Sequence, residues 1–275
     1  MEQKQPVRLV VTDMDGTLLN SRKEISPRFF RLMDYMHQEG IRLAVATGRQ
    51  WSDIAHRFEK YIDGLLFAGS NGTVITEGRG IIRAYPAPKE TLLAAVELLR
   101  KVDGVCPLLC GVERMFTDRA GPWLYEKGGV YAPGVVELED VSRAFEEEEI
   151  LKISVFHRDE GALPRTIELL RCFEDTLELL PSGTDWLETQ LRGASKGNAV
   201  RVIQETFGIS FEETAIFADY LNDMSMMDRG YYSYAMKNAH LDIKAAARFV
   251  TEYTNDEDGV AETLIELFGL QKGGL

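Results

Sequence analysis

The sequence predicts an α/β fold: a doubly wound parallel sheet with an α+β module inserted into it. Three observations lead to this prediction. Short apolar runs alternate with helical patterns from residue 7 to residue 69, the alternation is lost between residues 85 and 187, and it returns from residue 188 onward. Such alternation is typical of a Rossmann-like sheet that carries helices on both faces.

The N-terminal elements follow in a regular order. Val7–Thr12 is a short β-branched run that fits a strand covered on both faces. Ser26 and Pro27 supply an N-cap and a first-turn proline, and Gly40 ends the helix that they begin. Two alternating runs about Gly78–Gly80 predict a hairpin. Between helix and hairpin we expect a strand at 41–49, a helix at 51–62 and a strand at 64–72.

The middle of the chain has a different pattern and is interpreted as the inserted module. It opens with a long helix at 88–102 and has strand-like pieces at 115–118, 151–157 and 177–180, with a helix at 163–173. The predicted domains are therefore a core of residues 1–84 and 188–275 and an inserted α+β domain of residues 85–187. Elements expected in the last part are helices at 196–207, 224–228, 241–247 and 259–268 and strands at 214–219, 231–236 and 248–251.

Composition limits the classes of partner. The chain has 275 residues, is 45% hydrophobic and carries a net charge of −13, which suits a globular protein and argues against nucleic acid or an anionic membrane as partner. The cysteines Cys106, Cys110 and Cys172 form no CxxC pair, so we expect reduced thiols. With no signal-like or membrane-spanning segment, the sequence predicts a cytoplasmic protein, a monomer or a homodimer.

Unusual polar residues stand where predicted strands end. The first strand ends in Asp13 and Asp15, the second in Thr47, and the strand at 214–219 in Asp219, while Lys196 opens a helix. Each alone is compatible with an ordinary loop or helix cap. Ligands of open parallel sheets bind beyond the carboxyl ends of the strands, so these four segments together indicate a binding site.

The acidic residues among them predict a metal site. Asp13, Asp15, Asp219 and Asp223 would repel one another strongly unless a divalent cation lay among them. Their hard oxygen donors, with no histidine or cysteine motif nearby, favour Mg²⁺ over zinc.

A cation gives the two aspartates of the first strand separate tasks. Asp13, held ionised by Mg²⁺, can attack phosphorus and form an aspartyl-phosphate, while Asp15 gives a proton to the departing oxygen and later takes one from water. The Thr47 hydroxyl, the Lys196 ammonium and backbone N–H groups of glycine-containing loops, Gly48 among them, would hold the phosphoryl oxygens.

These motifs resemble a known family. The chain is similar to the haloacid dehalogenase superfamily, specifically to Cof-like phosphatases with the type IIB cap, in the segments DMDGTLL, ATGR, SKGNAV, ADYLNDMSM, GSNG, AMKNA and TNDEDGVAETL. The resemblance covers essentially the whole core. It implies a phosphoric monoester hydrolase acting on a small phosphorylated metabolite, such as a sugar phosphate or a phosphorylated cofactor, with the inserted domain as a cap that encloses the leaving group.

Site residues carried over from the family are named by their positions here. The resemblance implies that Asp13 is nucleophile and Mg²⁺ ligand, and that Asp15 is general acid/base and offers its backbone carbonyl to the metal. Asp219 would be the third protein ligand, and Asp223 would reach the metal through water or brace Lys196. The residues expected to bind phosphate are Thr47, Gly48, Lys196 and Asn222.

Two alternatives and one departure stay open. A phosphomutase of the phosphomannomutase type would transfer the phosphoryl group to a sugar hydroxyl, and a non-catalytic protein would only bind the phosphometabolite. Ala218 stands where the family usually has glycine, which would matter if the position needs a positive φ or close backbone approach. The inserted-domain aromatics Trp123, Tyr125 and Trp186 are interpreted as core residues, with contact to a sugar or ring as the alternative.

Overall fold

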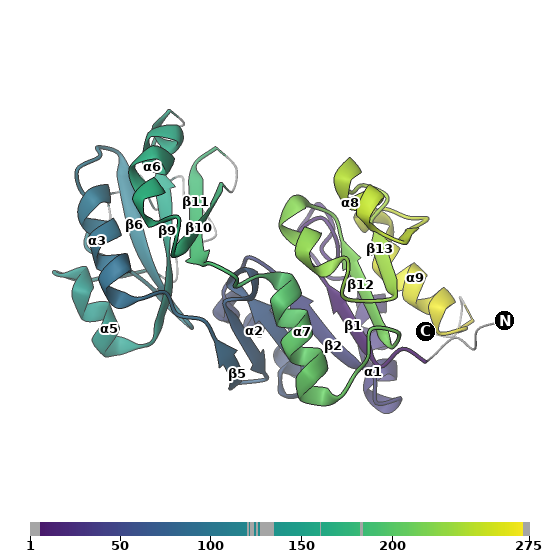
Figure 1. The fold of residues 1–275 in the computed structure, drawn as a ribbon. Coiled ribbons are helices and arrows are strands. Elements are labelled where there is room, and N and C mark those ends of the chain that lie inside the picture. Colours follow the sequence, from purple (N-terminus) through teal and green to yellow (C-terminus); the bar gives the residue numbers. More distant parts are fainter. Residues whose placement is uncertain are drawn as a thin grey trace. The chain divides into compact units, whose positions relative to one another are not determined.

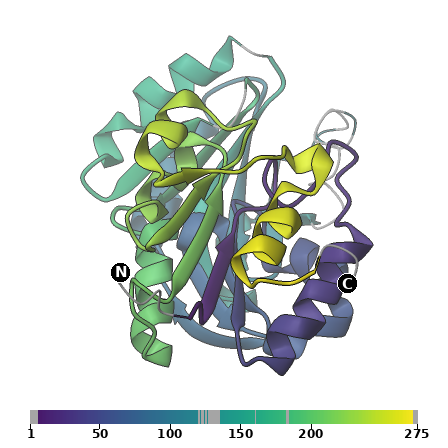
Figure 2. The same cartoon turned by 90° about the vertical axis from the view of Figure 1, so that its right-hand side faces the viewer.

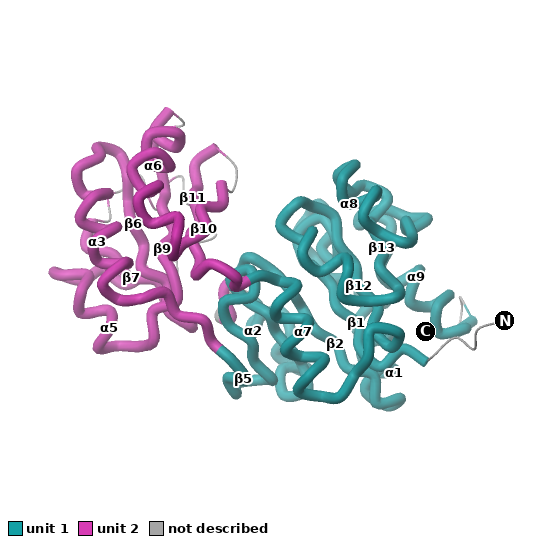
Figure 3. Tube along the Cα trace, viewed as in Figure 1, with its two compact units in different colours: residues 1–49, 53–83, 195–275 teal, residues 50–52, 84–194 magenta. Residues whose placement is uncertain are grey.

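The computed structural model divides the chain into two compact units (Figure 3). It describes residues 6–119, 121, 124, 126, 135–159, 161–181 and 184–271. The first unit comprises residues 1–49, 53–83 and 195–275, and the second comprises residues 50–52 and 84–194. The sequence predicts that the chain passes from the core into the inserted domain at 84/85 and returns at 187/188. In the structure these boundaries lie at 83/84 and 194/195.

The first unit is built on an eight-stranded sheet of order β14-β13-β12-β1-β2-β3-β4-β5 (Figure 1). All neighbours from β14 to β3 pair in parallel, and β4 pairs antiparallel with β3. This order confirms the predicted doubly wound sheet. Its strands are β1 (Leu9–Thr12), β2 (Arg42–Ala46), β3 (Leu66–Gly69), β4 (Val74–Glu77), β5 (Gly80–Ala84), β12 (Thr214–Ala218), β13 (Tyr232–Ala235) and β14 (Phe249–Val250).

Helices lie on both faces of this sheet. Figure 2 shows α1 and α9 side by side on one face and α7 on the other. Ser26 and Ser195 cap α1 and α7 by accepting from backbone N–H groups three residues later; the cap at Ser26 confirms the prediction from the sequence. The α-helices are α1 (Pro27–Gln38), α2 (Trp51–Arg57), α7 (Lys196–Phe207), α8 (Leu241–Ala246) and α9 (Gly259–Leu267); the 3₁₀-helices are η1 (Glu59–Gly64), η2 (Ser70–Gly72), η6 (Leu221–Met226) and η7 (Asn255–Glu257).

Two predicted helices differ from the observed ones. The helix expected at 51–62 ends at Arg57 and gives way to the 3₁₀-helix η1. The helix expected at 224–228 is the 3₁₀-helix η6, which begins three residues earlier. It starts early because the carboxylate of Asp223 accepts from the backbone N–H groups of Asp219 and Tyr220. This contact is a local capping interaction at the start of the helix, and capping leaves no periodic signal in the sequence.

The second unit is an α+β structure with a six-stranded sheet of order β10-β11-β9-β6-β7-β8. Its helices α3 and α6 place Leu92, Val96 and Leu170 in one apolar core with Leu109 and Ile153 of the sheet. The elements are α3 (Lys89–Leu99), β6 (Val105–Gly111), β7 (Met115–Thr117), β8 (Val135–Glu137), η4 (Val141–Arg143), α5 (Ala144–Glu147), β9 (Ile150–His157), α6 (Ala162–Leu170), η5 (Arg171–Phe173), β10 (Leu177–Pro181) and β11 (Trp186–Leu191).

Three strands of this sheet are absent from the sequence prediction. β6 contains Pro107, which weakens a strand pattern, and β8 has only three residues. β11 pairs with both β9 and β10, so the second boundary predicted at 187/188 falls inside a strand and is wrong.

The cysteines and the membrane prediction can be checked directly. All three cysteines are free thiols; Cys106 and Cys110 are buried and Cys172 is exposed. Burial raises the pKa of both buried thiols to about 11, which keeps them protonated and unreactive. Within the described ranges, no helix combines the length and apolarity that crossing a bilayer requires.

A buried histidine in the second unit generates a prediction for stability against pH. Nδ1 of His157 lies 3.1 Å from the carbonyl oxygen of Asp185, and Nε2 lies 2.9 Å from the Thr166 hydroxyl. The ring therefore donates through Nδ1 and accepts at Nε2, as a neutral imidazole does. Burial lowers the pKa of His157 below its ordinary value.

We expect His157 to cost stability in acid. The unfolded chain takes up its proton below about pH 6.5, while the folded ring resists protonation, so the stabilisation is present above that pH and is lost as the pH falls. Urea unfolding at about pH 7.5 and about pH 5 should show a smaller loss in His157→Gln than in wild type. His37→Gln, a change at an exposed histidine of α1, is the control and should behave as wild type. Equal losses in all three proteins would contradict the role of His157.

Candidate active site

The site lies at the carboxyl ends of the parallel strands of the first unit, and one buried lysine joins its parts. Lys196 Nζ donates to Asp13 Oδ1 at 2.6 Å and to Asp223 Oδ1 at 2.5 Å. These residues come from the start of α7, the end of β1 and η6, and all three side chains are buried. The structure thus brings together residues that the sequence placed at separate strand ends.

Asp219 completes a group of three carboxylates. Asp13, Asp219 and Asp223 each offer an oxygen, and these oxygens lie within 4.8 Å of one another. Three carboxylates face the single positive charge of Lys196, so the cluster retains excess negative charge. A compact set of hard oxygen donors with uncompensated charge fits a divalent cation such as Mg²⁺.

The pKa values of Asp13 and Asp219 are both raised in this cluster. Burial raises the pKa of Asp13 well above its ordinary value; Lys196 opposes this shift, and the charges of Asp223 and Asp219 add to it. Burial also raises the pKa of Asp219 to about 6, although a hydrogen bond from Thr17 acts in the other direction. The cluster is therefore electrostatically unfavourable by itself, which is the condition that a bound cation relieves.

Backbone geometry makes this close approach feasible. Gly16 has φ +83°, and a Cβ there would lie 2.3 Å from Asp219 Oδ2. The next residue, Thr17, donates its hydroxyl to Asp219 Oδ1 at 2.8 Å. At the other side, a Cβ on Gly197 would lie 1.8 Å from the carbonyl oxygen of Ser225, so only glycine lets α7 start against η6.

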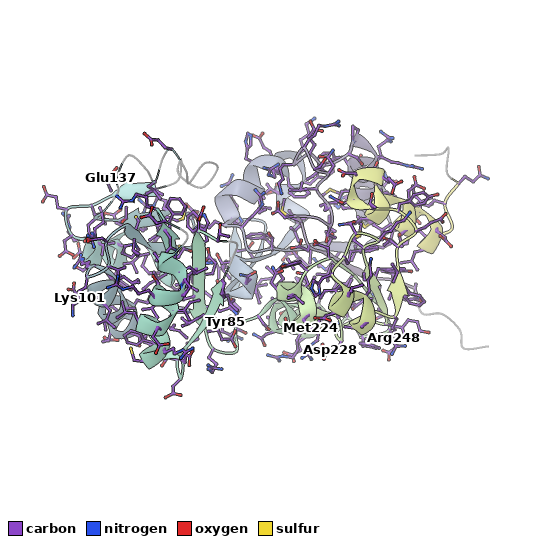
Figure 4. The ribbon with its side chains drawn as sticks, turned by 90° about the horizontal axis from the view of Figure 1, so that it is seen from above. Tyr85, Lys101, Glu137, Met224, Asp228 and Arg248 are labelled. Atoms are coloured by element: carbon purple, nitrogen blue, oxygen red, sulfur yellow. The ribbon has the colours of Figure 1, made fainter. Side chains whose placement is uncertain are left out.

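Asp223 has a second role in addition to its contact with Lys196. Its Oδ2 accepts from the backbone N–H groups of Asp219 and Tyr220, each at 3.2 Å. One carboxylate thus fixes both the lysine and the chain segment that carries Asp219. Met224, on the same short helix, is exposed (Figure 4).

Asp15 lies in a different environment from Asp13. Arg49 donates Nε to Asp15 Oδ2 at 2.6 Å and Nη2 to Oδ1 at 2.9 Å, and Lys23 donates to Oδ1 at 2.7 Å. Burial alone would raise the pKa of Asp15, but these two cations outweigh it and lower the pKa to about 2. The side chain of Asp15 does not belong to the three-carboxylate group. Sequence reasoning assigned no role to Arg49 or Lys23.

Three of the four residues predicted to bind phosphate, all but Lys196, lie around Asn71. The backbone N–H of Asn71 donates to the Thr47 carbonyl at 2.9 Å, and Asn222 Nδ2 donates to Asn71 Oδ1 at 3.4 Å. A Cβ on Gly48 would lie 3.3 Å from the same Oδ1. Asn71 has φ 58°, a conformation that asparagine tolerates better than most residues. The GSNG segment was the sequence signal for it, although no residue of that segment was assigned a role.

Two asparagines support the loop after β1. Asn238 Nδ2 donates to the carbonyl of Gly16 at 2.7 Å, and Asn255 Nδ2 donates to the carbonyl of Leu19 at 2.9 Å. The backbone N–H of Asn255 in turn donates to Asn238 Oδ1 at 3.1 Å. The AMKNA and TNDEDG segments therefore hold the loop that carries the two aspartates.

Ala218 causes no strain. It is the last residue of β12, is fully buried, and pairs with Ala235 of β13. It is not among the residues with positive φ in the described parts of the chain. The position therefore does not require the positive φ for which the family's usual glycine would matter.

The aromatic residues of the inserted module can be placed in part. Trp186 is half-buried and packs against Phe156, with ring centroids 4.8 Å apart. This contact agrees with the interpretation of Trp186 as a packing residue. Trp123 and Tyr125 lie outside the described residues.

Comparisons with known proteins point to one family. The model of haloacid dehalogenase-like hydrolases matches residues 10–264. The Escherichia coli protein named 5-amino-6-(5-phospho-D-ribitylamino)uracil phosphatase YbjI is 26% identical over 268 residues, covering 94% of this chain and 95% of the relative.

Solved structures agree. A haloacid dehalogenase-like hydrolase from Bacteroides thetaiotaomicron superimposes with a TM-score of 0.85 at 27% identity, covering 95% of this chain and 100% of that one. A sugar phosphatase of haloacid dehalogenase subclass IIB superimposes with a TM-score of 0.76 at 23% identity, covering 96% and 99% of the two chains, which shows the likeness of fold.

The contact between Gly16 and Asp219 can be tested by substitution. We expect Gly16→Ala to lower the free energy of unfolding by about 1–2 kcal/mol for its positive φ, and by about 1 kcal/mol more because Asp219 must turn away from Thr17. Gly40→Ala is the matched control, since Gly40 has φ +71° and its Cβ would meet nothing within 4 Å. If urea unfolding shows the same loss of unfolding free energy in both variants, the Asp219 side chain moves aside without a measurable cost.

Proposed function

The chain belongs to the haloacid dehalogenase-like hydrolase family, and on that premise we propose that it is a Mg²⁺-dependent phosphatase of small phosphorylated metabolites. The observation that carries the proposal is the buried lysine between two carboxylates, with the third carboxylate beside them. Phosphoryl transfer requires a cation and a nucleophile at one point, and three carboxylates held together with a buried lysine supply the groups for both.

Mg²⁺ would be held by side-chain oxygens of Asp13 and Asp219 and by the backbone carbonyl of Asp15, with Asp223 reaching it through water or bracing Lys196, as the family resemblance implies. The cation would neutralise the cluster and offset negative charge on the phosphoryl oxygens. The three side chains fit this role because their oxygens already lie within 4.8 Å of one another.

Asp13 is the nucleophile in this proposal. Its carboxylate oxygen attacks phosphorus, the bond from phosphorus to the ester oxygen breaks, and that oxygen leaves with a proton from Asp15. Beside Arg49 and Lys23 Asp15 is ionised in the free protein, so it would take up this proton as the substrate binds. Asp15 then takes a proton from water as the water oxygen attacks the aspartyl-phosphate, which releases inorganic phosphate and restores Asp13. Lys196 keeps Asp13 oriented through its 2.6 Å hydrogen bond.

Phosphate binding is assigned to the loops around Asn71. The Thr47 hydroxyl, the backbone at Gly48 and the amide of Asn222 come from two separate strand ends, and Lys196 adds a positive charge. The observed contacts of Asn71 with the Thr47 carbonyl and the Asn222 amide support a common cradle. We add Asn71 to the proposed phosphate-binding residues.

For the substrate we propose a phosphomonoester of a sugar or of a cofactor precursor. Support comes from the E. coli relative, whose name gives a phosphoribityl compound as its substrate. The second unit is proposed to serve as the cap, since it is a separate α+β unit inserted between β5 and α7 (Figure 1). A screen of phosphorylated metabolites with release of inorganic phosphate as the readout tests this assignment.

Metal dependence follows from the carboxylate cluster. Activity should vanish in excess EDTA and return with Mg²⁺, and Ca²⁺ should substitute poorly because its coordination is longer and looser. Independently of activity, Mg²⁺ at about a hundred times its dissociation constant should stabilise the folded protein by about 2.7 kcal/mol. Asp219→Asn should lose this stabilisation. Full activity of a verified metal-free sample would refute the mechanism.

Substitutions of Asp13 and of Asp15 should lower the phosphatase activity in different ways. Asp13→Asn should lower turnover by roughly a thousandfold or more with folding retained, because an amide does not attack phosphorus. Asp15→Asn should be severe for a sugar phosphate and milder in the first step for an aryl phosphate, whose leaving group departs unaided.

Mass spectrometry of the Asp15→Asn protein tests the intermediate. Its hydrolysis should be slow, so that a phosphorylated enzyme accumulates with the modification on Asp13. A modification at another residue, or substantial activity of a pure Asp13→Asn sample, would show that the nucleophile is assigned wrongly.

A further inference from the structure

The short helix η6 has an apolar side that remains exposed. In a 3₁₀-helix, side chains three residues apart lie on the same side of the helix. Asp223 and Met226 accordingly form the buried side of η6. Leu221 and Met224, the latter labelled in Figure 4, form a second side and are 44% and 38% exposed. The helix that carries Asp223 therefore presents two apolar side chains outward.

Tyr220, directly before this helix, adds an aromatic ring to the same segment and is 57% exposed. In the described parts of the chain seven large apolar or aromatic residues are exposed, and three of them lie at positions 220–224. Single exposed apolar side chains are common on protein surfaces, whereas a group of them marks a surface that contacts a ligand or a partner. Segment 220–224 is such a group.

The position of the Tyr220 ring is supported from two directions. The backbone N–H of Tyr220 donates to Asp223 Oδ2 at 3.2 Å. The ring lies against that of His240, with centroids 5.8 Å apart and an angle of 84° between the ring planes. The backbone N–H of His240 in turn donates to the carbonyl of Asp219 at 2.8 Å. The ring is thus exposed but held, which reduces the entropy that a ligand would have to offset on binding to it.

Both segments that meet at this ring belong to the rim of the candidate active site. Tyr220 follows Asp219 directly, and Asn222 of the proposed phosphate cradle lies two residues further on. His240 is two residues from Asn238, whose side chain binds the loop after β1. Because adjacent Cα atoms are about 3.8 Å apart, the Tyr220 side chain starts one residue away from the carboxylate cluster. The rim around a phosphomonoester bound at that cluster therefore includes Tyr220.

The other rim side chains described above offer different chemistry. Thr47, Asn71, Asn222 and Asn238 carry hydroxyl or amide groups, which suit phosphate oxygens and hydroxyl groups. Segment 220–224 instead offers an aromatic ring and two apolar side chains, which suit a ring or another apolar part of a ligand.

We propose that Tyr220 is a specificity-determining residue that packs against a planar ring in the leaving group, and that Leu221 and Met224 extend the apolar surface beside it. The substrate class is then a phosphomonoester with an aromatic or heteroaromatic ring close to the phosphate. This inference rests on the proposed phosphatase function. Contact between aromatic rings is favourable beyond the area that it buries, so such a substrate gains affinity that an open-chain ester does not.

The test compares benzyl phosphate, cyclohexylmethyl phosphate and ethyl phosphate in the presence of Mg²⁺. Each releases a primary alcohol, so the three differ mainly in the group beside the ester and little in the chemistry of phosphoryl transfer. Benzyl phosphate carries an aromatic ring, cyclohexylmethyl phosphate an apolar ring without an aromatic face, and ethyl phosphate no ring. The readout is the kcat/KM for benzyl phosphate divided by that for each of the other two esters.

Wild type should favour benzyl phosphate over both other esters. Tyr220→Ala should lower kcat/KM about twentyfold for benzyl phosphate and less than about threefold for ethyl phosphate, within the range measured for stacking on an aromatic side chain. Tyr220→Phe keeps the ring and should keep both ratios. Tyr220→Leu should still favour ring-bearing esters over ethyl phosphate but lose the preference for benzyl over cyclohexylmethyl phosphate.

Phe249→Ala is the matched control. It removes another exposed aromatic ring, one that packs against Tyr234 on the edge strand β14, and should leave both ratios as in wild type. Urea unfolding checks that each variant is folded. Tyr220→Leu carries the test if Tyr220→Ala does not fold.

The outcomes separate this inference from the proposed function. If Tyr220→Ala lowers kcat/KM equally for all three esters, the ring supports the site or contacts another protein surface, and the specificity role is wrong. Wild type that hydrolyses benzyl and ethyl phosphate equally well would also contradict that role, while the phosphatase function would stand. Wild type that hydrolyses no phosphomonoester with Mg²⁺ would overturn the proposed function, and this inference with it.

Discussion

The ammonium of Lys196 is the contact on which the candidate site depends. It binds carboxylates from the end of β1 and from η6 while it stands at the first position of α7. Removing one member of a buried ion pair strands the other charge, which is far more costly than losing an exposed pair. Three segments that are distant in sequence are therefore stable in this arrangement only together. The same contact orients Asp13 and leaves the excess negative charge that attracts a cation.

The close packing of these segments explains why small residues stand beside the charged ones. Gly16 allows Asp219 to approach the loop after β1, and Gly197 allows α7 to start against η6. A side chain at either position would move a charged group by more than the tolerance of a hydrogen bond. The asparagines Asn238 and Asn255 then hold the same loop from the other side through backbone carbonyls. The close packing of the backbone and the positions of the charged groups therefore depend on each other.

The two aspartates at the end of β1 are two residues apart and yet have opposite surroundings. Asp13 is buried beside other carboxylates, which raises its pKa, whereas Asp15 faces Arg49 and Lys23, which lower its pKa to about 2. Neighbouring carboxylates acquire separate roles when their environments differ in this way. The turn at Gly16 and the arginine at the end of β2 create that difference, and neither is visible from the spacing of the aspartates alone.

The sequence by itself determined the alternation of strands and helices, the cap at Ser26, and the presence of Asp13, Asp219 and Lys196 at the ends where a parallel sheet binds ligands. These features are local, because periodicity, capping and strand ends are encoded within a few residues. The tertiary structure decided that β11 belongs to the inserted unit and that Arg49 and Asn71 join the site. These features depend on contacts between segments far apart in the chain, and such contacts have no period or spacing by which a single sequence could reveal them.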